Sequence, residues 1–232
     1  GNGVTIPALF GIAALCNAAV AVYIYSLVPE FMLRFIAWLL IHSVYRLRQQ
    51  GIENIPEEGA AVLICNHVSF VDPIVIAAAS RRPIRFVMDH RIYRTPLIRF
   101  VFHHMHAIPI APAREDAAMM EAAFEQVAEA LEAGELVAIF PEGKITDTGE
   151  LHPFRPGVQR IVGRTPVPVI PMALQGLWGS FFSRKDGPAM SKPMRRGMFS
   201  KIALVVGSPV LPELATPEHL QTIVAGLRGD WR

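Results

Sequence analysis

The sequence predicts an α/β fold in which helices flank a central, largely parallel sheet, preceded by N-terminal membrane helices. Two observations carry this prediction. Short apolar runs alternate with segments of helical periodicity, which is the pattern of βαβ units. Ahead of them, no charged side chain occurs from Gly1 to Pro29, as is typical of a membrane segment. The expected strands are residues 60–65, 84–88, 107–111, 136–140, 167–172 and 202–206.

The composition fits a membrane-associated protein of one domain, or of one domain plus an appendage. Of 232 residues, 52% are hydrophobic and 18% are charged, and the mean hydropathy is +0.34, which is apolar for a freely soluble domain. The formal net charge of +2 gives no reason to expect a nucleic-acid partner. Residues 183–201 carry a local charge of +5, which leaves −3 for the remainder. This basic segment predicts an anionic partner, or else it is a solvated loop.

Two apolar helices are expected at the N-terminus. Residues 4–28 would form a helix of roughly 38 Å at about 1.5 Å per residue, enough to cross a bilayer. Residues 31–45 predict a second helix, which lies in the membrane interface or pairs with the first as a re-entrant segment. One stripe recurs every four residues along it: Arg34, Trp38, His42 and Arg46.

Arg46 and Arg48 follow the second helix at once. Basic residues flank membrane helices on the cytoplasmic side, so the rest of the chain is expected there. The sequence thus divides into membrane-spanning and interfacial helices at 1–48 and a folded domain at 49–232.

The remaining helices are shorter and separated by turn residues. Gly51 to Gly59 form a turn-rich entry to the domain. The helix at 115–133 has acids in its first turn, and Gly134 can end it. Its apolar face is Met120, Phe124, Val127 and Leu131. The other expected helices are residues 74–79, 96–105, 154–162 and 218–227.

The stretch Asn66-His67-Val68-Ser69-Phe70-Val71-Asp72 lies where the strand 60–65 passes to a helix that opens with Pro73. Ligand sites of open α/β sheets lie beyond the carboxyl ends of the strands. There His67 can take a proton from a hydroxyl, while Asp72 fixes its ring tautomer and stabilises the imidazolium. The alternative is that Asp72 is only a helix N-cap and His67 a hydrogen-bonded loop residue.

Arg114 stands between the strand 107–111 and the helix at 115–133. Backbone N–H groups at a helix start favour anions, and a guanidinium can fork onto a phosphate. Arg114 therefore predicts a phosphate contact. The alternative is a surface arginine that pairs with Glu115 or Asp116.

Phe140-Pro141-Glu142-Gly143 turns the chain at the end of the strand 136–140. Gly143 lets the backbone approach a ligand closely. Glu142 could accept a hydrogen bond from a hydroxyl or amine, or simply hold the loop. Lys144 supplies positive charge to a phosphate.

No metal site is expected. Cys/His clusters with zinc-ligand spacing do not occur in the sequence, and the cluster His103, His104 and His106 lacks carboxylates at useful spacing. Cys16 and Cys65 are the only cysteines. Both are expected to be small buried residues rather than a disulfide.

Four blocks, in this order and spacing, resemble the glycerolipid acyltransferases of the 1-acylglycerol-3-phosphate acyltransferase type. They are the N-H-x-x-x-x-D pattern at 66–72, Arg114, F-P-E-G at 140–143 and Val167-Pro168-Val169-Ile170-Pro171. The resemblance covers about residues 35 to 210. Lys144-Ile145-Thr146 replaces the usual T-R-S, and this run is more similar to the 2-acylglycerophosphoethanolamine acyltransferase branch. The N-terminal segment, with Val28-Pro29-Glu30-Phe31, is similar to the last membrane helix and linker of a transporter–acyltransferase fusion; the alternative is a simple membrane anchor.

The resemblance implies the glycerolipid acyltransferase fold and an enzyme at the bacterial inner membrane, with its catalytic domain on the cytoplasmic side. It implies transfer of a fatty acyl group from acyl-CoA or acyl carrier protein, a donor substrate rather than a cofactor, to the free hydroxyl of a lysophospholipid. His67 and Asp72 would be catalytic, and Arg114, Glu142, Gly143 and Lys144 would bind substrate. Lys144 departs from the family pattern, which puts its phosphate contact in doubt.

The acceptor expected from residues 144–146 is lysophosphatidylethanolamine, with 1-acylglycerol-3-phosphate as its rival. Two alternatives come from other classes: a non-catalytic membrane lipid-binding domain, and a hydrolase in which water is the nucleophile. A G-x-S-x-G elbow is absent from the sequence, which disfavours a serine lipase, and nothing makes Ser69 a nucleophile. The basic segment could contact lipid headgroups, acyl carrier protein or the phosphates of coenzyme A.

Overall fold

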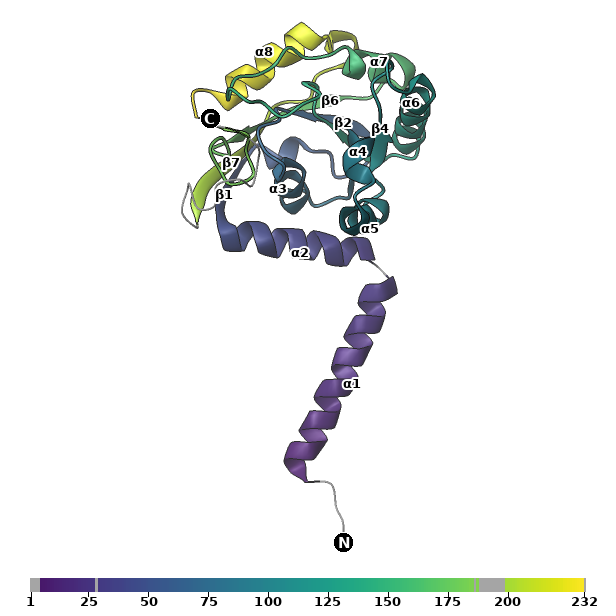
Figure 1. Ribbon diagram of the computed structural model, residues 1–232, viewed down its shortest axis with the longest axis vertical. Coiled ribbons are helices and arrows are strands. Elements are labelled where there is room, and N and C mark those ends of the chain that lie inside the picture. Colours follow the sequence, from purple (N-terminus) through teal and green to yellow (C-terminus); the bar gives the residue numbers. More distant parts are fainter. Residues whose placement is uncertain (1–4, 28, 186, 188–198, 232) are drawn as a thin grey trace.

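Seven strands form one sheet in the computed structural model, which describes residues 5–27, 29–185, 187 and 199–231 (Figure 1). The strands are β1 (Tyr45–Gln50), β2 (Ala61–Cys65), β3 (Ile84–Asp89), β4 (Ile108–Ile110), β5 (Leu136–Ile139), β6 (Val169–Gln175) and β7 (Ser200–Val206). Their order is β1-β7-β6-β2-β5-β3-β4. Every neighbouring pair is parallel except β6 and β7. The predicted α/β class with a largely parallel sheet is therefore confirmed.

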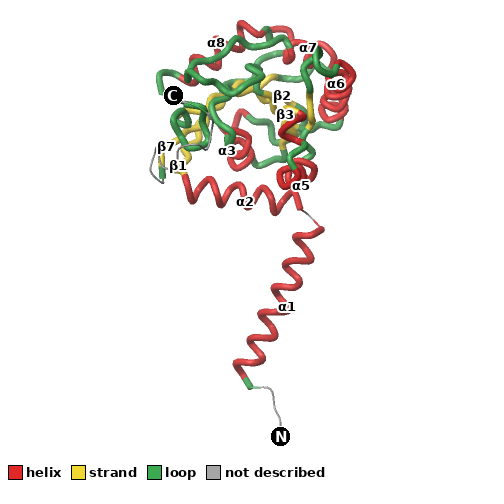
Figure 2. The backbone as a smooth tube through the Cα atoms, viewed as in Figure 1, coloured by secondary structure: helices red, strands yellow, loops and turns green. Residues whose placement is uncertain are grey.

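Helices surround this sheet, as Figure 2 shows. The α-helices are α1 (Ile6–Leu27), α2 (Pro29–Val44), α3 (Asp72–Ala79), α4 (His90–Tyr93), α5 (Pro96–His104), α6 (Ala117–Glu132), α7 (Gly157–Arg164) and α8 (Pro217–Arg228). Two short 3-10 helices, η1 (Ile52–Asn54) and η2 (Pro212–Leu214), lie in the connections. Most of the basic segment at 183–201 falls outside the described residues.

The strand β2 shows why the sheet is the core. All five of its residues are buried, because helices cover both faces. Leu63 and its alternate neighbours join the apolar cluster with α2 and α3, whereas Val62 and Ile64 join the cluster with α6, α7 and α8. Burial of each large aliphatic side chain contributes about 1.5–3 kcal/mol. A strand buried on both sides reads as a continuous apolar run, which is how the sequence predicted it.

The strand β1 was not predicted. It is an edge strand, paired only with β7, and most of its side chains are exposed. Tyr-Arg-Leu-Arg-Gln-Gln therefore contains no apolar run that would indicate a strand. Arg46 and Arg48, expected to flank a membrane helix, lie within this strand, and α2 passes into it without a linker.

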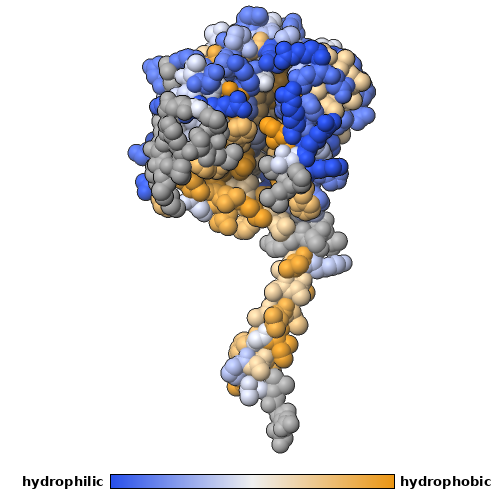
Figure 3. Space-filling model, viewed as in Figure 1, coloured by the Kyte–Doolittle hydropathy of each residue, from blue (hydrophilic) through white to orange (hydrophobic). Residues whose placement is uncertain are grey.

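The helix α1 projects from the body (Figure 1). By length and composition, Ile6–Ile24 could cross a membrane, and none of this span is buried. Figure 3 shows apolar residues along α1 and on the adjoining part of the body. Cys16 is exposed on this helix, so the expectation that both cysteines are buried is wrong for Cys16 and right for Cys65.

The helix α2 lies against the body rather than beside α1. Ile41 is buried, and the Arg34 guanidinium donates to the Ser80 carbonyl at 2.9 Å. Trp38 and His42 stack on one another at 4.5 Å between ring centroids. The predicted four-residue stripe is therefore interrupted, because Arg34 turns to the body and Arg46 belongs to β1.

Candidate active site

The loop that carries His67 follows β2, and the loop that carries Glu142 follows β5. These strands are parallel neighbours, with Ile64 opposite Ile139, so their carboxyl ends bring the two loops together. Asn66 fixes the end of β2 to β6: its Nδ2 donates to the Leu174 carbonyl at 3.0 Å and its Oδ1 accepts from the Leu174 N–H at 2.7 Å.

His67 and Asp72 form a hydrogen-bonded pair. Their Nδ1 and Oδ2 atoms are 2.8 Å apart, and Asp72 is fully buried. The same Oδ2 accepts from the backbone N–H groups of Val68 at 2.7 Å and Ser69 at 2.9 Å. Asp72 is the first residue of α3, and its N-cap, Val71, makes no side-chain cap bond. The N-cap interpretation of Asp72 is therefore wrong, and its carboxylate serves the histidine loop.

The backbone and the ring of His67 are both held. Its N–H donates to Glu142 Oε1 at 2.8 Å, and its carbonyl accepts from the Thr146 N–H at 2.9 Å. Its ring stacks on Phe140, with 4.1 Å between centroids. Because Asp72 engages Nδ1, Nε2 is the ring nitrogen left to act on a ligand. The His67 side chain is 18% exposed, so a ligand can reach it.

Glu142 ties two loops together. Its second oxygen, Oε2, accepts from the His152 N–H at 2.7 Å, so both carboxylate oxygens bond to backbone. This geometry corresponds to the loop-holding alternative. Burial raises the pKa of Glu142, and the hydrogen bonds from these two backbone N–H groups oppose this effect. Burial also raises the pKa of Asp72, against the opposing effects of His67 and of two backbone N–H groups.

Gly143 and Lys144 lie exposed just beyond Glu142. Gly143 has a φ of +67°, which favours glycine. A Cβ there would lie 2.7 Å from Cζ of Arg155, so glycine also allows this arginine to approach the backbone.

Arg114 lies in the turn after β4 and is exposed. The expected alternative, an ion pair with Glu115 or Asp116, does not form: Glu115 pairs with Arg91, and Asp116 accepts from Met119 N–H at the start of α6. The strand β4 is two strand positions from β5, or about 10 Å. Arg114 is thus at the same edge of the sheet as the pair but not beside it.

The start of the basic segment reaches the histidine loop. The Phe70 N–H donates to the Phe182 carbonyl at 3.1 Å, and Arg184 lies 5.6 Å from the centroid of the Phe70 ring. Ser69 is fully buried, and its hydroxyl accepts from the Val71 N–H at 3.3 Å. Ser69 is therefore a loop residue, as expected.

Sequence reasoning assigned no role to several residues that shape this site. Phe140 and Asn66 were inside recognised motifs, so their presence was a signal that went unused. Thr146 and His152 act through their backbone N–H groups, which leave no trace in the side-chain pattern. Arg155 comes close to Gly143 only through the fold.

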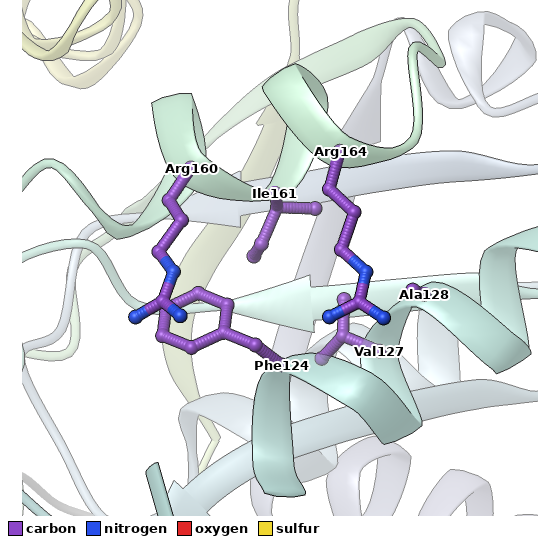
Figure 4. A pocket seen from close by; sticks show the side chains of 6 residues that line it. All are labelled: Phe124, Val127, Ala128, Arg160, Ile161 and Arg164. Atoms are coloured by element: carbon purple, nitrogen blue, oxygen red, sulfur yellow. The ribbon is translucent and has the colours of Figure 1, made fainter. Parts of the chain in front are cut away.

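The pocket in Figure 4 is separate from this site. It lies between α6 and α7, and its two arginines, Arg160 and Arg164, pair with Glu121 and Glu125. It contains neither His67 nor Asp72, so we do not assign catalysis to it. Over the described ranges, no group of three or more His, Cys, Asp or Glu side chains could hold a metal.

The family model described as Acyltransferase matches residues 46–175. The chain is 29% identical over 148 residues to a chloroplastic 1-acyl-sn-glycerol-3-phosphate acyltransferase of Brassica napus, covering 63% of this chain and 42% of that protein. It is 26% identical over 160 residues to the 1-acyl-sn-glycerol-3-phosphate acyltransferase of Bacillus subtilis, covering 68% and 70%. The chain thus spans less than half the length of the plant relative.

A solved structure has the same fold. The crystal structure of the 1-acyl-sn-glycerophosphate (LPA) acyltransferase PlsC from Thermotoga maritima superposes with a TM-score of 0.64 at 20% identity, over 88% of this chain and 76% of that one. The family match includes both loops that meet at His67 and runs through most of the sheet. On this basis, the chain belongs to the acyltransferase family.

Proposed function

We propose that this chain transfers a fatty acyl group from an acyl thioester to the free hydroxyl of a lysophospholipid. The observation that carries the proposal is the 2.8 Å contact between His67 Nδ1 and the buried Asp72, with Nε2 left for the substrate. A neutral imidazole held in this tautomer is suited to act as a general base.

The proposed reaction is one displacement. Nε2 of His67 takes the proton of the acceptor hydroxyl as its oxygen attacks the thioester carbonyl carbon. The carbon–sulfur bond then breaks, and the imidazolium returns the proton to the leaving thiolate. Asp72 holds the ring and stabilises its charged form. General-base catalysis supplies about 10²–10⁴-fold, and positioning and oxyanion stabilisation must supply the rest.

The names of the relatives support 1-acylglycerol-3-phosphate as the acceptor. They favour it over lysophosphatidylethanolamine, which the run Lys144-Ile145-Thr146 led us to expect. A structural contact can also explain the threonine at position 146, without reference to the acceptor: the Thr146 hydroxyl accepts a hydrogen bond from the Gly149 N–H at 3.1 Å. Lysophosphatidylethanolamine remains the second candidate, on the sequence run alone.

The other substrate contacts belong to the same proposal. Arg114, Gly143 and Lys144 would contact the acceptor, while Glu142 would act by holding the loops. The donor would be acyl-CoA or acyl carrier protein. The exposed apolar helix α1 supports attachment to a membrane, which we propose to be the bacterial inner membrane with the catalytic domain on the cytoplasmic side. A fused or associated transporter remains part of this proposal.

Thiol release from an acyl thioester tests the function. Wild type and His67→Ala are assayed with 1-acylglycerol-3-phosphate, with lysophosphatidylethanolamine and without acceptor. The control is His219→Ala, which removes an exposed histidine of α8. We expect release that needs both acceptor and His67, faster with 1-acylglycerol-3-phosphate. Release without acceptor would indicate a hydrolase, and none from folded wild type would favour a lipid-binding domain.

A further inference from the structure

Arg155 lies against the loop that holds the catalytic histidine. Its N–H donates to the Pro141 carbonyl at 2.9 Å, so its backbone is tied beside Glu142. A Cβ on Gly143 would lie 2.7, 2.8 and 2.9 Å from Cζ, Nη1 and Nε of Arg155. Three nearly equal distances indicate that the guanidinium turns its flat side to Gly143. Its N–H edges are then directed away from the backbone, where they can donate to a ligand.

Among the residues that the structure describes, no acidic side chain neutralises the charge of Arg155. Its side chain makes no hydrogen bond or ion pair with any residue that the structure describes, and it is exposed. Glu142, which directly precedes Gly143 in the chain, has both oxygens bonded to backbone N–H groups. Lys144 adds a second exposed positive charge to the same turn. Six other arginines of the domain have acidic partners: Arg81 with Glu57, Arg85 with Glu135, Arg91 with Glu115, Arg160 with Glu121, Arg164 with Glu125 and Arg228 with Glu150.

The position suits the phosphate of a substrate. Gly143 follows Glu142, whose Oε1 is 2.8 Å from the His67 N–H. In 1-acylglycerol-3-phosphate, one carbon and one oxygen separate the hydroxyl-bearing carbon from phosphorus. A cation that binds this phosphate must therefore lie near the base. Arg155 meets that requirement through the loop itself, whereas Arg114 follows a strand about 10 Å from β5.

We propose that Arg155, seated over Gly143, binds a substrate phosphate and so places the reacting hydroxyl at His67. The inference rests on the proposed function, since the phosphate belongs to the lysophospholipid acceptor or to a coenzyme A thioester. A guanidinium donates two parallel hydrogen bonds to a phosphate, which fixes orientation as well as affinity.

Steady-state kinetics of Arg155→Gln and Arg155→Lys test this role. Acceptor and acyl-CoA are varied separately, each against a saturating partner. Arg160→Gln is the matched control, because Arg160 lies on α7 and pairs with Glu121. For Arg155→Gln we expect the KM of one substrate to rise roughly 10- to 100-fold, the size of charge-assisted hydrogen bonds, with kcat within about twofold. Arg155→Lys should recover part of the loss.

The substrate whose KM rises identifies the source of the phosphate. An unchanged KM for both substrates would overturn the proposal. Calorimetric binding of hexanoylglycerol 3-phosphate, without thioester, tests Arg155 independently of turnover. Wild type that binds this probe but transfers no acyl group would remove the proposed reaction and leave the Arg155 role standing. Equal affinity of wild type and Arg155→Gln for this probe would exclude the acceptor as the source of the phosphate, and if the KM for acyl-CoA is also unchanged, the Arg155 role is removed.

Discussion

The substitution Glu142→Gln separates a residue that binds substrate from one that holds loops. The carboxylate of Glu142 accepts from the backbone N–H groups of His67 and His152 at 2.8 and 2.7 Å. Glutamine offers one acceptor oxygen, and its NH₂ group would face the other N–H donor. One largely buried N–H then loses its partner, which costs about 1–3 kcal/mol. For a domain of this size, each kcal/mol lowers the Tm by about 2–4 °C, so we expect a fall of roughly 2–12 °C.

The assay combines thermal unfolding of the detergent-solubilised chain with acyl-transfer kinetics. We expect a lower Tm and a lower kcat, because His67 loses its anchored backbone, while the acceptor KM stays within about twofold. Glu150→Gln is the control: this acid lies on the surface and pairs with Arg228, so the change should cost at most about 1 kcal/mol. An unchanged Tm together with a raised acceptor KM would refute the loop-holding role.

The same variant should change how stability depends on pH. Burial raises the pKa of Glu142 above its value in the unfolded chain. Its stabilising contribution is therefore present in full below the unfolded pKa of about 4.3 and is lost as pH rises through the folded pKa. Glutamine has no such loss, so the deficit of Glu142→Gln should be smaller at pH 7 than at pH 4. Equal deficits in urea unfolding at the two pH values would contradict this.

Three further changes test the other parts of the proposal. Asp72→Asn should lower kcat by about 10²–10⁴-fold, since an amide NH₂ facing Nδ1 forces the tautomer in which Nε2 cannot accept a proton; near-normal turnover would exclude the pair. Arg114→Ala should raise the acceptor KM, and unchanged KM and kcat would remove its phosphate contact. Deleting residues 1–29 should release part of the protein from membrane vesicles in a sedimentation assay, and full retention would assign attachment to α2.

The sequence was sufficient to predict the sheet, because its central strands are buried on both faces and therefore appear in the sequence as continuous apolar runs. It was also sufficient to predict the pair His67 and Asp72, whose five-residue spacing closes within one loop. It did not indicate β1, an edge strand that depends on β7 far along the chain. The sequence also did not indicate the two hydrogen bonds of Glu142. Their donors are backbone N–H groups, which every residue except proline carries, so the residue types at the donor positions do not reveal them.

The junction between α2 and β1 has a mechanical consequence. Val44 ends the helix and Tyr45 begins the strand, and Tyr45 is buried in the apolar cluster that α2 and α3 share. Because no linker separates α2 from β1, the body cannot rotate relative to α2 at this point. If α2 lies in the membrane interface, one of the two arrangements expected from the sequence, its immersion depth fixes the height of His67 above the lipid plane. A flexible insertion at this junction would leave every side chain of the site in place, yet it would free the domain to rotate away from its lipid acceptor.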